Sequence, residues 1–173
     1  MKRFLSGLGL SVILAACGSD STAPTPVPVQ LAGIWTMTET RTSVTGGECL
    51  DGTFQSGVGT AAQNTMTFTQ NGTSLNATST TQSNGVSCSW FGTADVGRFA
   101  LTLSSCQSNA NQLGLRCANG NVRDLKIAQS GITASLNSAG YTGTKGDTYS
   151  VLVAGTQTLV GTVTVNSNVT MTK

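Results

Sequence analysis

The sequence contains no histidine, and only 9% of its residues are charged, against about 25% in ordinary globular proteins. Histidine is the commonest general base and a frequent zinc ligand, so its absence argues against many enzyme classes and metal sites. The acidic side chains are scattered; Glu48 and Asp51 are close together, but they fit a solvated loop better than a glycosidase pair. We therefore expect a protein that is not an enzyme and that binds no metal ion or other cofactor.

A surplus of one charge is also missing. The chain has nine basic and seven acidic residues, and two of the basic ones, Lys2 and Arg3, lie at the extreme N-terminus. The remaining seven basic residues equal the seven acidic ones. Nothing here forms the basic surface that nucleic acids require, so we expect no nucleic-acid partner.

Long apolar runs are absent as well. The N-terminal run, residues 4–16, is far shorter than the roughly 20 residues that span a bilayer. It follows the positive charges of Lys2 and Arg3 and ends in small residues. This pattern is typical of a secretory signal peptide that is cleaved from the mature protein.

The end of this run resembles the lipobox of bacterial lipoproteins. Leu14, Ala15 and Ala16 precede Cys17, the residue that is acylated and becomes the new N-terminus in that family. The alternative is an ordinary secretory signal in which Cys17 has no role. Gly18 follows instead of the Asp that retains such proteins in the inner membrane, so the resemblance implies a cell-envelope protein held by lipid at the outer membrane, facing the periplasm.

The three prolines of the sequence, Pro24, Pro26 and Pro28, alternate with other residues just after this cysteine. Such spacing favours extended, polyproline-like chain, and about twelve residues at ~3.1 Å each reach roughly 40 Å. We expect a signal peptide at residues 1–16, a lipidated tether at residues 17–30 and one domain at residues 31–173. That domain is long enough for one hydrophobic core.

Threonine, serine, asparagine, glutamine and glycine supply the polarity that charge does not. Threonine favours strands, glycine and asparagine favour turns, and no long segment has helical periodicity. Strands are expected near residues 34–41, 112–117, 148–154, 158–165 and 169–173, in addition to three hairpins. The sequence thus predicts an all-β antiparallel up-and-down meander, closed into a barrel of eight to ten strands, with a β-sandwich as the alternative.

The three hairpins are predicted from turn residues between alternating segments. A turn at Asn71 and Gly72 would place Phe68 opposite Leu75. A second turn at Val96 and Gly97 would put Cys88, Trp90, Phe99, Leu101 and Leu103 on one face. A third, at Ser130 and Gly131, would place Ile127 opposite Ala134 and Leu125 opposite Leu136.

Four cysteines follow Cys17, which predicts two disulfides in an exported domain. They are Cys49, Cys88, Cys106 and Cys117, and three pairings are possible. In the predicted hairpin Cys88 and Cys106 lie on opposite faces, so a direct bond between them would need a β-bulge. We expect Cys49–Cys88 and Cys106–Cys117.

The start of the domain resembles the Gly-x-Trp motif that opens the first strand of lipocalins and related calycin barrels. Gly33, Ile34 and Trp35 carry this resemblance, which implies a ligand-binding barrel. In that family an Arg from near the end of the barrel packs over the Trp. Here the alternation of the last strand places Lys173 near Trp35, so we expect residues 169–173 to pair with residues 34–41.

Two functions remain open. The first is a carrier of a small apolar ligand, because barrels of about eight strands can hold one. Its lining would come from Trp35, Met37, Glu39, Arg41, Phe68, Trp90, Phe99 and Leu101, with Leu75 and Leu103 beside them. Glu39 and Arg41 would sit at the mouth and orient a polar group, or pair with neighbours at a strand end. The second function is a structural or protein-binding envelope module, inhibitors included, with a solid core and no ligand.

Overall fold

The described part of the chain forms nine β-strands and one short 3-10 turn. The computed structural model describes residues 29–47, 49, 55–82, 85–107, 111–117 and 119–173, so the predicted signal peptide, Cys17 and nearly all of the tether lie outside the described residues. No helix in the described ranges is long and apolar enough to cross a membrane. The elements are β1 (Gly33–Gly46), η1 (Gln55–Gly57), β2 (Ala61–Asn71), β3 (Ser74–Thr81), β4 (Ser87–Asp95), β5 (Arg98–Cys106), β6 (Gln112–Arg116), β7 (Val122–Asn137), β8 (Gly140–Val153) and β9 (Leu159–Thr172).

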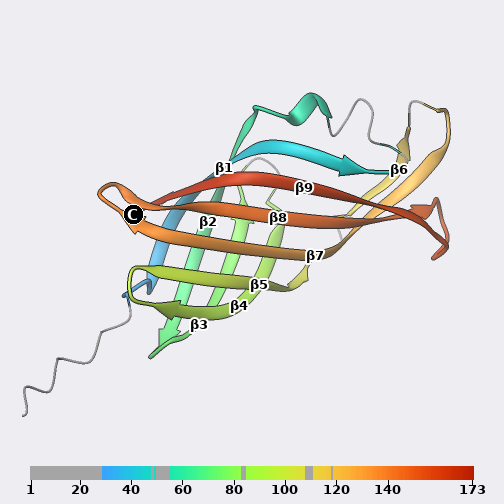
Figure 1. The fold of residues 1–173 in the computed structure, drawn as a ribbon. Coiled ribbons are helices and arrows are strands. Elements are labelled where there is room, and N and C mark those ends of the chain that lie inside the picture. Colours follow the sequence, from blue (N-terminus) through green and yellow to red (C-terminus); the bar gives the residue numbers. More distant parts are fainter. Residues whose placement is uncertain (1–28, 48, 50–54, 83–84, 108–110, 118) are drawn as a thin grey trace, which may run out of the picture.

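Eight of these strands close into an antiparallel barrel, as predicted. Neighbouring strands pair in the order β5-β4-β3-β2-β1-β9-β8-β7-β6, and β5 also pairs with β7, which closes the ring and leaves β6 as an addition to β7. Figure 1 shows the resulting meander. The β-sandwich alternative is therefore excluded. Closure gives β1 and β5 a partner on both sides, which protects backbone groups that an open edge would expose.

The wall of the barrel is higher on one side than on the other. Strands β1, β7, β8 and β9 have 14 to 16 residues, whereas β2 to β5 have 8 to 11. Pairing of β1 with β2 ends at Thr40 opposite Ala61, but pairing of β1 with β9 continues to Gly46 opposite Val163. The long strands thus extend beyond the closed barrel to one end, on the right in Figure 1.

The first two predicted turns are nearly as expected. The turn at Val96 and Gly97 is confirmed, since Asp95 pairs with Arg98 across it. At the other hairpin the two-residue turn is Gly72–Thr73, so Phe68 pairs with Ala77 and not with Leu75. A register shift of two residues keeps every side chain on its predicted face, because the side-chain period of a strand is two.

The third predicted turn, at Ser130 and Gly131, is wrong. Both residues lie inside β7, where Gly131 pairs with Thr102 of β5 on one side and Gly146 of β8 on the other. A hairpin there would have left β5 without its second neighbour. The predicted strands at residues 158–165 and 169–173 are likewise a single strand, β9, and residues 148–154 are mostly the end of β8.

Both disulfides form, but in a different pairing from the expected one. The bonds are Cys49–Cys117 and Cys88–Cys106, with Cα–Cα distances of 4.6 Å and 4.0 Å. The pairing of β4 with β5 shifts between Ser89 and Trp90, so that Ser104 is an extra residue on β5. This β-bulge reverses the alternation of β5 and brings Cys106 to the face of Cys88.

Two separate apolar clusters fill the inside. The larger contains sixteen buried residues of the closed barrel, among them Trp35, Phe68 and Met171. The smaller lies on the extended wall and includes Val163, Val165 and the disulfide Cys49–Cys117. On the inward face of β9, Val165 belongs to the small cluster and Val169 to the large one, and the residue between them on that face is Ser167. A polar level therefore divides the interior.

Candidate functional site

The apolar residues predicted to line a ligand site all lie in the larger cluster. Their side chains are almost completely buried, with no more than 8% of any residue exposed; they are Trp35, Met37, Phe68, Trp90, Phe99 and Leu101. The strands therefore bring the predicted set together inside the barrel. Leu75 is buried among them as well, and Leu103 packs against the cluster.

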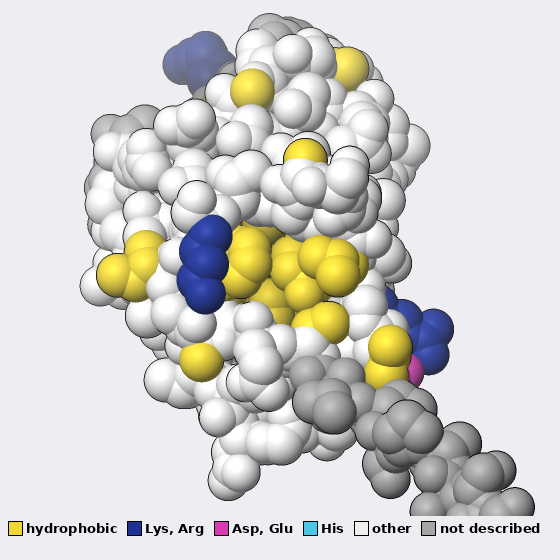
Figure 2. All heavy atoms as spheres, turned by 90° about the vertical axis from the view of Figure 1, so that its left-hand side faces the viewer, with side chains coloured by type: hydrophobic (Ala, Val, Ile, Leu, Met, Phe, Trp, Pro, Cys, Tyr) yellow, Lys and Arg dark blue, Asp and Glu magenta, His cyan; other side chains and the backbone are white. Residues whose placement is uncertain are grey.

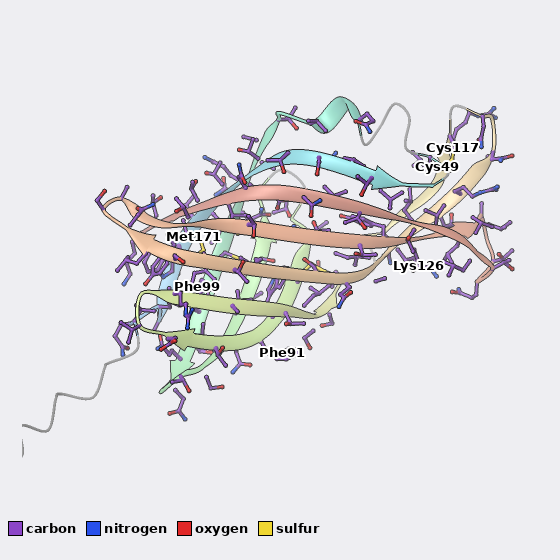
Figure 3. All side chains as sticks on the ribbon, in the orientation of Figure 1. Cys49, Phe91, Phe99, Cys117, Lys126 and Met171 are labelled. Atoms are coloured by element: carbon purple, nitrogen blue, oxygen red, sulfur yellow. A yellow bond between two sulfur atoms is a disulfide. The ribbon has the colours of Figure 1, made fainter. Side chains whose placement is uncertain are left out.

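These side chains contact one another across the barrel axis. The rings of Phe68 and Phe99 meet edge to face with centroids 5.7 Å apart, Phe99 meets Tyr141 at 5.4 Å, and Tyr141 meets Trp35 at 5.6 Å. Such T-shaped pairs are the preferred arrangement of aromatic rings in a packed core. Figure 3 places Phe99 and Met171 within the barrel. The aromatic side chains run from β2 through β5 and β8 to β1, so they cross the closed barrel near the end where Trp35 lies.

The chain that precedes β1 packs against one end of the barrel. Leu31 is fully buried, and its carbonyl oxygen accepts a 2.8 Å hydrogen bond from Nε1 of Trp35. Its backbone N–H donates to Oε1 of Gln70 at 2.7 Å, and Nε2 of Gln70 donates to the carbonyl oxygen of Val29 at 2.7 Å. Residues 29–31 are thus fixed across the end where Trp35 lies.

A chain of five polar side chains crosses the interior between the two apolar clusters, and we call it the polar layer. Nζ of Lys145 lies 2.9 Å from Oε2 of Glu39 and 2.8 Å from Oδ2 of Asp147. Oγ of Ser167 donates to Oε1 of Glu39 at 2.9 Å, and Oγ of Ser130 donates to Oδ1 of Asp147. At each end of the polar layer, a serine hydroxyl donates a hydrogen bond to a carboxylate.

Strand register explains why these residues meet. Ser130 is opposite Asp147 on the β7–β8 pair, and Lys145 is opposite Ser167 on the β8–β9 pair. Alternation along β8 puts Tyr141, Lys145 and Asp147 on the inner face. The layer lies at the level where the short strands begin, because Glu39 pairs with Ala62 near the start of β2. Glu39 therefore lies at the mouth of the closed barrel.

The electrostatics of the layer favour a protonated lysine. Burial alone would lower the pKa of Lys145, but the carboxylates of Asp147 and Glu39 outweigh it and raise the pKa above its ordinary value of 10.5. Burial, together with Asp147, also raises the pKa of Tyr149 to about 12. Both groups keep their protons at neutral pH. Lys145 therefore cannot take a proton from the hydroxyl of Ser130 or Ser167. Both hydroxyls already donate hydrogen bonds to carboxylates.

Arg41, the other polar residue of the predicted set, lies beside η1. Its guanidinium lies directly against the backbone of Gly57 in η1, and the backbone N–H of Gly59 donates to the Arg41 carbonyl oxygen at 2.9 Å. A β-bulge between Arg41 and Ser43 accompanies this contact. Arg41 thus connects η1, in the segment after β1, to the mouth of the closed barrel.

Four residues of the polar layer were not singled out from the sequence: Ser130, Lys145, Asp147 and Ser167. The signal that identifies two of them is the alternation from Tyr141 to Val151, which places Lys145 and Asp147 on one face. The strand predicted at residues 148–154 begins after Lys145 and Asp147 and therefore includes neither of them. No local pattern identifies Ser130 and Ser167, since serine is as common on the outer face of this barrel.

Hydrogen bonds to Asp124 stabilise the extended wall. Oδ1 of Asp124 accepts a 2.8 Å hydrogen bond from the N–H of Gly114 in β6, and Oδ2 accepts one of 2.9 Å from the N–H of Gly155 after β8. These two bonds lower the pKa of the Asp124 carboxyl below 3.8. Cys49–Cys117 closes the same end, and Figure 3 shows both cysteines there. This end is built from covalent and hydrogen-bonded cross-links.

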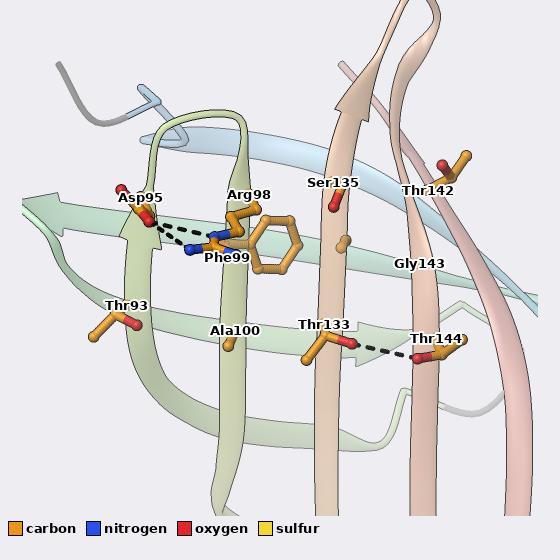
Figure 4. A pocket seen from close by; sticks show the side chains of 11 residues that line it. Thr93, Asp95, Arg98, Phe99, Ala100, Thr133, Ser135, Thr142, Gly143 and Thr144 are labelled. Atoms are coloured by element: carbon orange, nitrogen blue, oxygen red, sulfur yellow. Dashed lines mark hydrogen bonds and ion pairs between the residues drawn. The ribbon is translucent and has the colours of Figure 1, made fainter. Parts of the chain in front are cut away.

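Two grooves lie on the outer wall of the barrel. The larger, about 520 Å³, lies over β4, β5, β7 and β8 and is lined mainly by threonine, serine and small residues, with the ion pair of Asp95 and Arg98 at its edge (Figure 4). The smaller, about 330 Å³, lies beside Phe91 on β2 to β5. Neither groove contains the predicted set as a whole; Phe99 and Trp90 contribute to their floors.

No protein-family model, curated protein or solved structure matches this chain. Among the described residues, no group of three or more Cys, Asp or Glu side chains is placed to hold a metal ion.

Proposed function

We propose that this protein is a non-catalytic, lipid-anchored module of the cell envelope, whose barrel is a solid scaffold and not a container. The resemblance of residues 14–17 to a lipobox supports acylation of Cys17, and Gly18 supports an outer-membrane location facing the periplasm. Two disulfides support an oxidising compartment outside the cytoplasm. A surface module of this kind acts through what its outer wall and ends contact.

The packing of the predicted ligand-lining residues carries the proposal. The rings of Trp35 and Phe99 both contact that of Tyr141, and Phe99 also contacts Phe68, so these buried side chains form one connected aromatic cluster. Protein interiors of this kind are packed as densely as organic crystals, and a ligand would have to displace these rings. The polar layer adds a second obstacle from the mouth, because entry there would break the ion pairs of Lys145.

The absence of catalysis is supported by the state of the polar layer. Among the described residues, the polar layer brings serine, lysine and carboxylate side chains together. A serine nucleophile could be assembled from these groups. Lys145 holds its proton between Glu39 and Asp147, so it has no capacity as a general base. The layer is better suited to fixing strand register than to chemistry.

A second function is favoured by the closed eight-stranded barrel itself. Barrels of this size hold single small ligands in other proteins, and the Gly-x-Trp resemblance supports a lipocalin-like carrier of an apolar molecule. Such a ligand would need Phe99 or Met66 to change rotamer. The two functions predict different binding behaviour for the same protein.

Titration with a fluorescent fatty-acid analogue separates them. The solid scaffold predicts no saturable increase in emission with the wild-type protein. Phe99→Ala serves as the matched control, because a large-to-small substitution leaves a cavity that can admit an apolar molecule. Binding by the variant alone supports a filled wild-type barrel, and Met66→Ala provides the same control if Phe99→Ala does not fold. Tight, stoichiometric binding by the wild type would instead support the carrier.

A further inference from the structure

Apolar side chains are exposed together at the end of the barrel where the described chain begins. Ile34 is 66% exposed, Val96 54% and Leu136 55%. They lie at the start of β1, in the β4–β5 turn and at the end of β7. With Val29 and Lys173 they form what we call the end face.

Backbone hydrogen bonds tie the parts of the end face together. The N–H of Leu136 donates to the carbonyl oxygen of Gly97 at 2.6 Å, and the N–H of Val29 donates to the carbonyl oxygen of Asp95 at 3.3 Å. Val96 lies between these two contacts in the turn. In Figure 2, which views this end, hydrophobic side chains gather in a central hollow beside a basic side chain. The end face is thus one fixed surface and not a set of unrelated loops.

The position of the tether indicates what covers this surface. Residue 29 is on the end face, and it follows Cys17, the residue proposed to be acylated, by twelve positions. A chain of that length reaches at most roughly 40 Å. Because the tether starts at the end face, an acylated Cys17 would bring that end closer to the bilayer than the end with Cys49–Cys117.

We propose that the end face rests on the lipid surface to which Cys17 is anchored, which directs the disulfide-closed end away from the membrane. This rests on the lipid anchor proposed above. Exposed apolar patches mark membrane or protein contacts. Three small aliphatic residues bind lipid weakly on their own. A short tether makes such a contact intramolecular, so weak affinity is sufficient.

Tryptophan quenching by lipid tests the orientation. The full lipidated protein is incorporated into phosphatidylcholine vesicles whose acyl chains are brominated, with unbrominated vesicles as the reference. Val96→Trp places a reporter on the end face, and Leu159→Trp is the matched control, since Leu159 has a similar exposure of 59% after the β8–β9 turn at the opposite end. Leu136→Trp is the second reporter if Val96→Trp does not fold.

We expect the emission added by Val96→Trp to be strongly quenched by brominated lipid and that added by Leu159→Trp to be unchanged. Vesicle-bound protein with neither reporter quenched, or with both quenched equally, would overturn the proposal while leaving the anchor intact. If sedimentation shows that the wild-type protein is a dimer and that Val96→Ser dissociates it, the end face would bind a second copy of the chain. That result would also overturn the proposal. Failure of the protein to join vesicles at all would instead remove the anchor and the proposed function with it.

Discussion

The ammonium of Lys173 lies 5.3 Å from the centroid of the Trp35 ring, so the last residue of the chain packs over the first tryptophan of the barrel. The pairing of Met37 with Met171 and of Thr36 with Thr172 brings them together. The predicted contact and the predicted pairing of the two end strands are both confirmed. Closure of the barrel thus depends on the last residues of β9.

Deletion of residues 169–173 should destabilise the whole domain. The change removes Val169 and Met171 from the core and exposes the edges of both β1 and β8. Lys173→Ala is the matched control, and it should cost only about 0.5–1 kcal/mol, the value of an exposed cation–π contact. Thermal unfolding followed by circular dichroism measures both; a deletion variant that melts like the full chain would contradict the closure.

The disulfides should contribute unequally to stability. Peptide mapping of the unreduced protein should find Cys49–Cys117 and Cys88–Cys106. The first spans 68 residues and the second 18, and the longer loop loses more entropy in the unfolded chain. Loops of these sizes correspond to about 4 and about 3 kcal/mol. Denaturant unfolding of the two double Cys→Ser variants checks the order, and the expected pairing Cys49–Cys88 in the map would contradict the structure.

Lys145→Met should destabilise the barrel strongly at neutral pH. The substitution leaves Glu39 and Asp147 in the interior without their shared cation, and breaking a buried ion pair from one side costs about 3–5 kcal/mol. Denaturant unfolding at neutral pH measures this.

Lys126→Met is the control for this experiment. Lys126 lies on the neighbouring strand β7, and its Nζ donates to Oε1 of Gln157 at 3.2 Å near the surface. It should change stability little. An equal loss for both lysine variants would show that the ion pairs of the polar layer are not the cause.

Asp124 should make the extended wall sensitive to acid. Its pKa is lowered in the folded protein, by the N–H groups of Gly114 and Gly155, so its contribution to stability is present above its ordinary value of 3.8. That contribution is lost as the pH falls through the lower folded value. Asp124→Asn should be less stable than the wild type at neutral pH and should lose less stability on acidification. Parallel pH profiles for the two proteins would contradict this.

The parts of the fold that were predictable are those fixed by local rules. A two-residue period decides which side chains face inward, so Trp90, Phe99 and Leu101 follow from the turn at Val96 and Gly97 alone. The pairing of the end strands follows from two unprotected edges that need partners. Eight strands and a closed wall then satisfy both conditions.

The parts that were missed depend on distant segments. The bulge at Ser104 reverses the face of Cys106, and no local residue requires it. Gly131 resembles a turn residue, but strands β5 and β8 on its two sides keep it extended. The polar layer likewise needs the register of four strands before Lys145, Asp147, Ser130 and Ser167 can be recognised as one cluster. The local pattern of a strand predicts which face each side chain occupies, but only the pairing of distant strands determines which side chains meet.

Cys17→Ser should abolish incorporation of palmitate. The proposed anchor requires the thiol of Cys17 as the acyl acceptor, so the wild-type protein should be labelled and should fractionate with membranes. Gly18→Asp is a second variant, expected to keep the label while shifting the protein toward the inner membrane. A wild-type protein that takes up no label and is freely soluble outside the cytoplasm would contradict the anchor.

Native mass spectrometry of the protein extracted from its host membrane distinguishes a solid barrel from a ligand-filled one. A solid barrel predicts one mass, that of the chain from Cys17 onward with its acyl groups and two disulfides, and no further adduct that dissociates on collision. A stoichiometric small molecule released from the intact barrel would contradict the solid scaffold and establish a carrier.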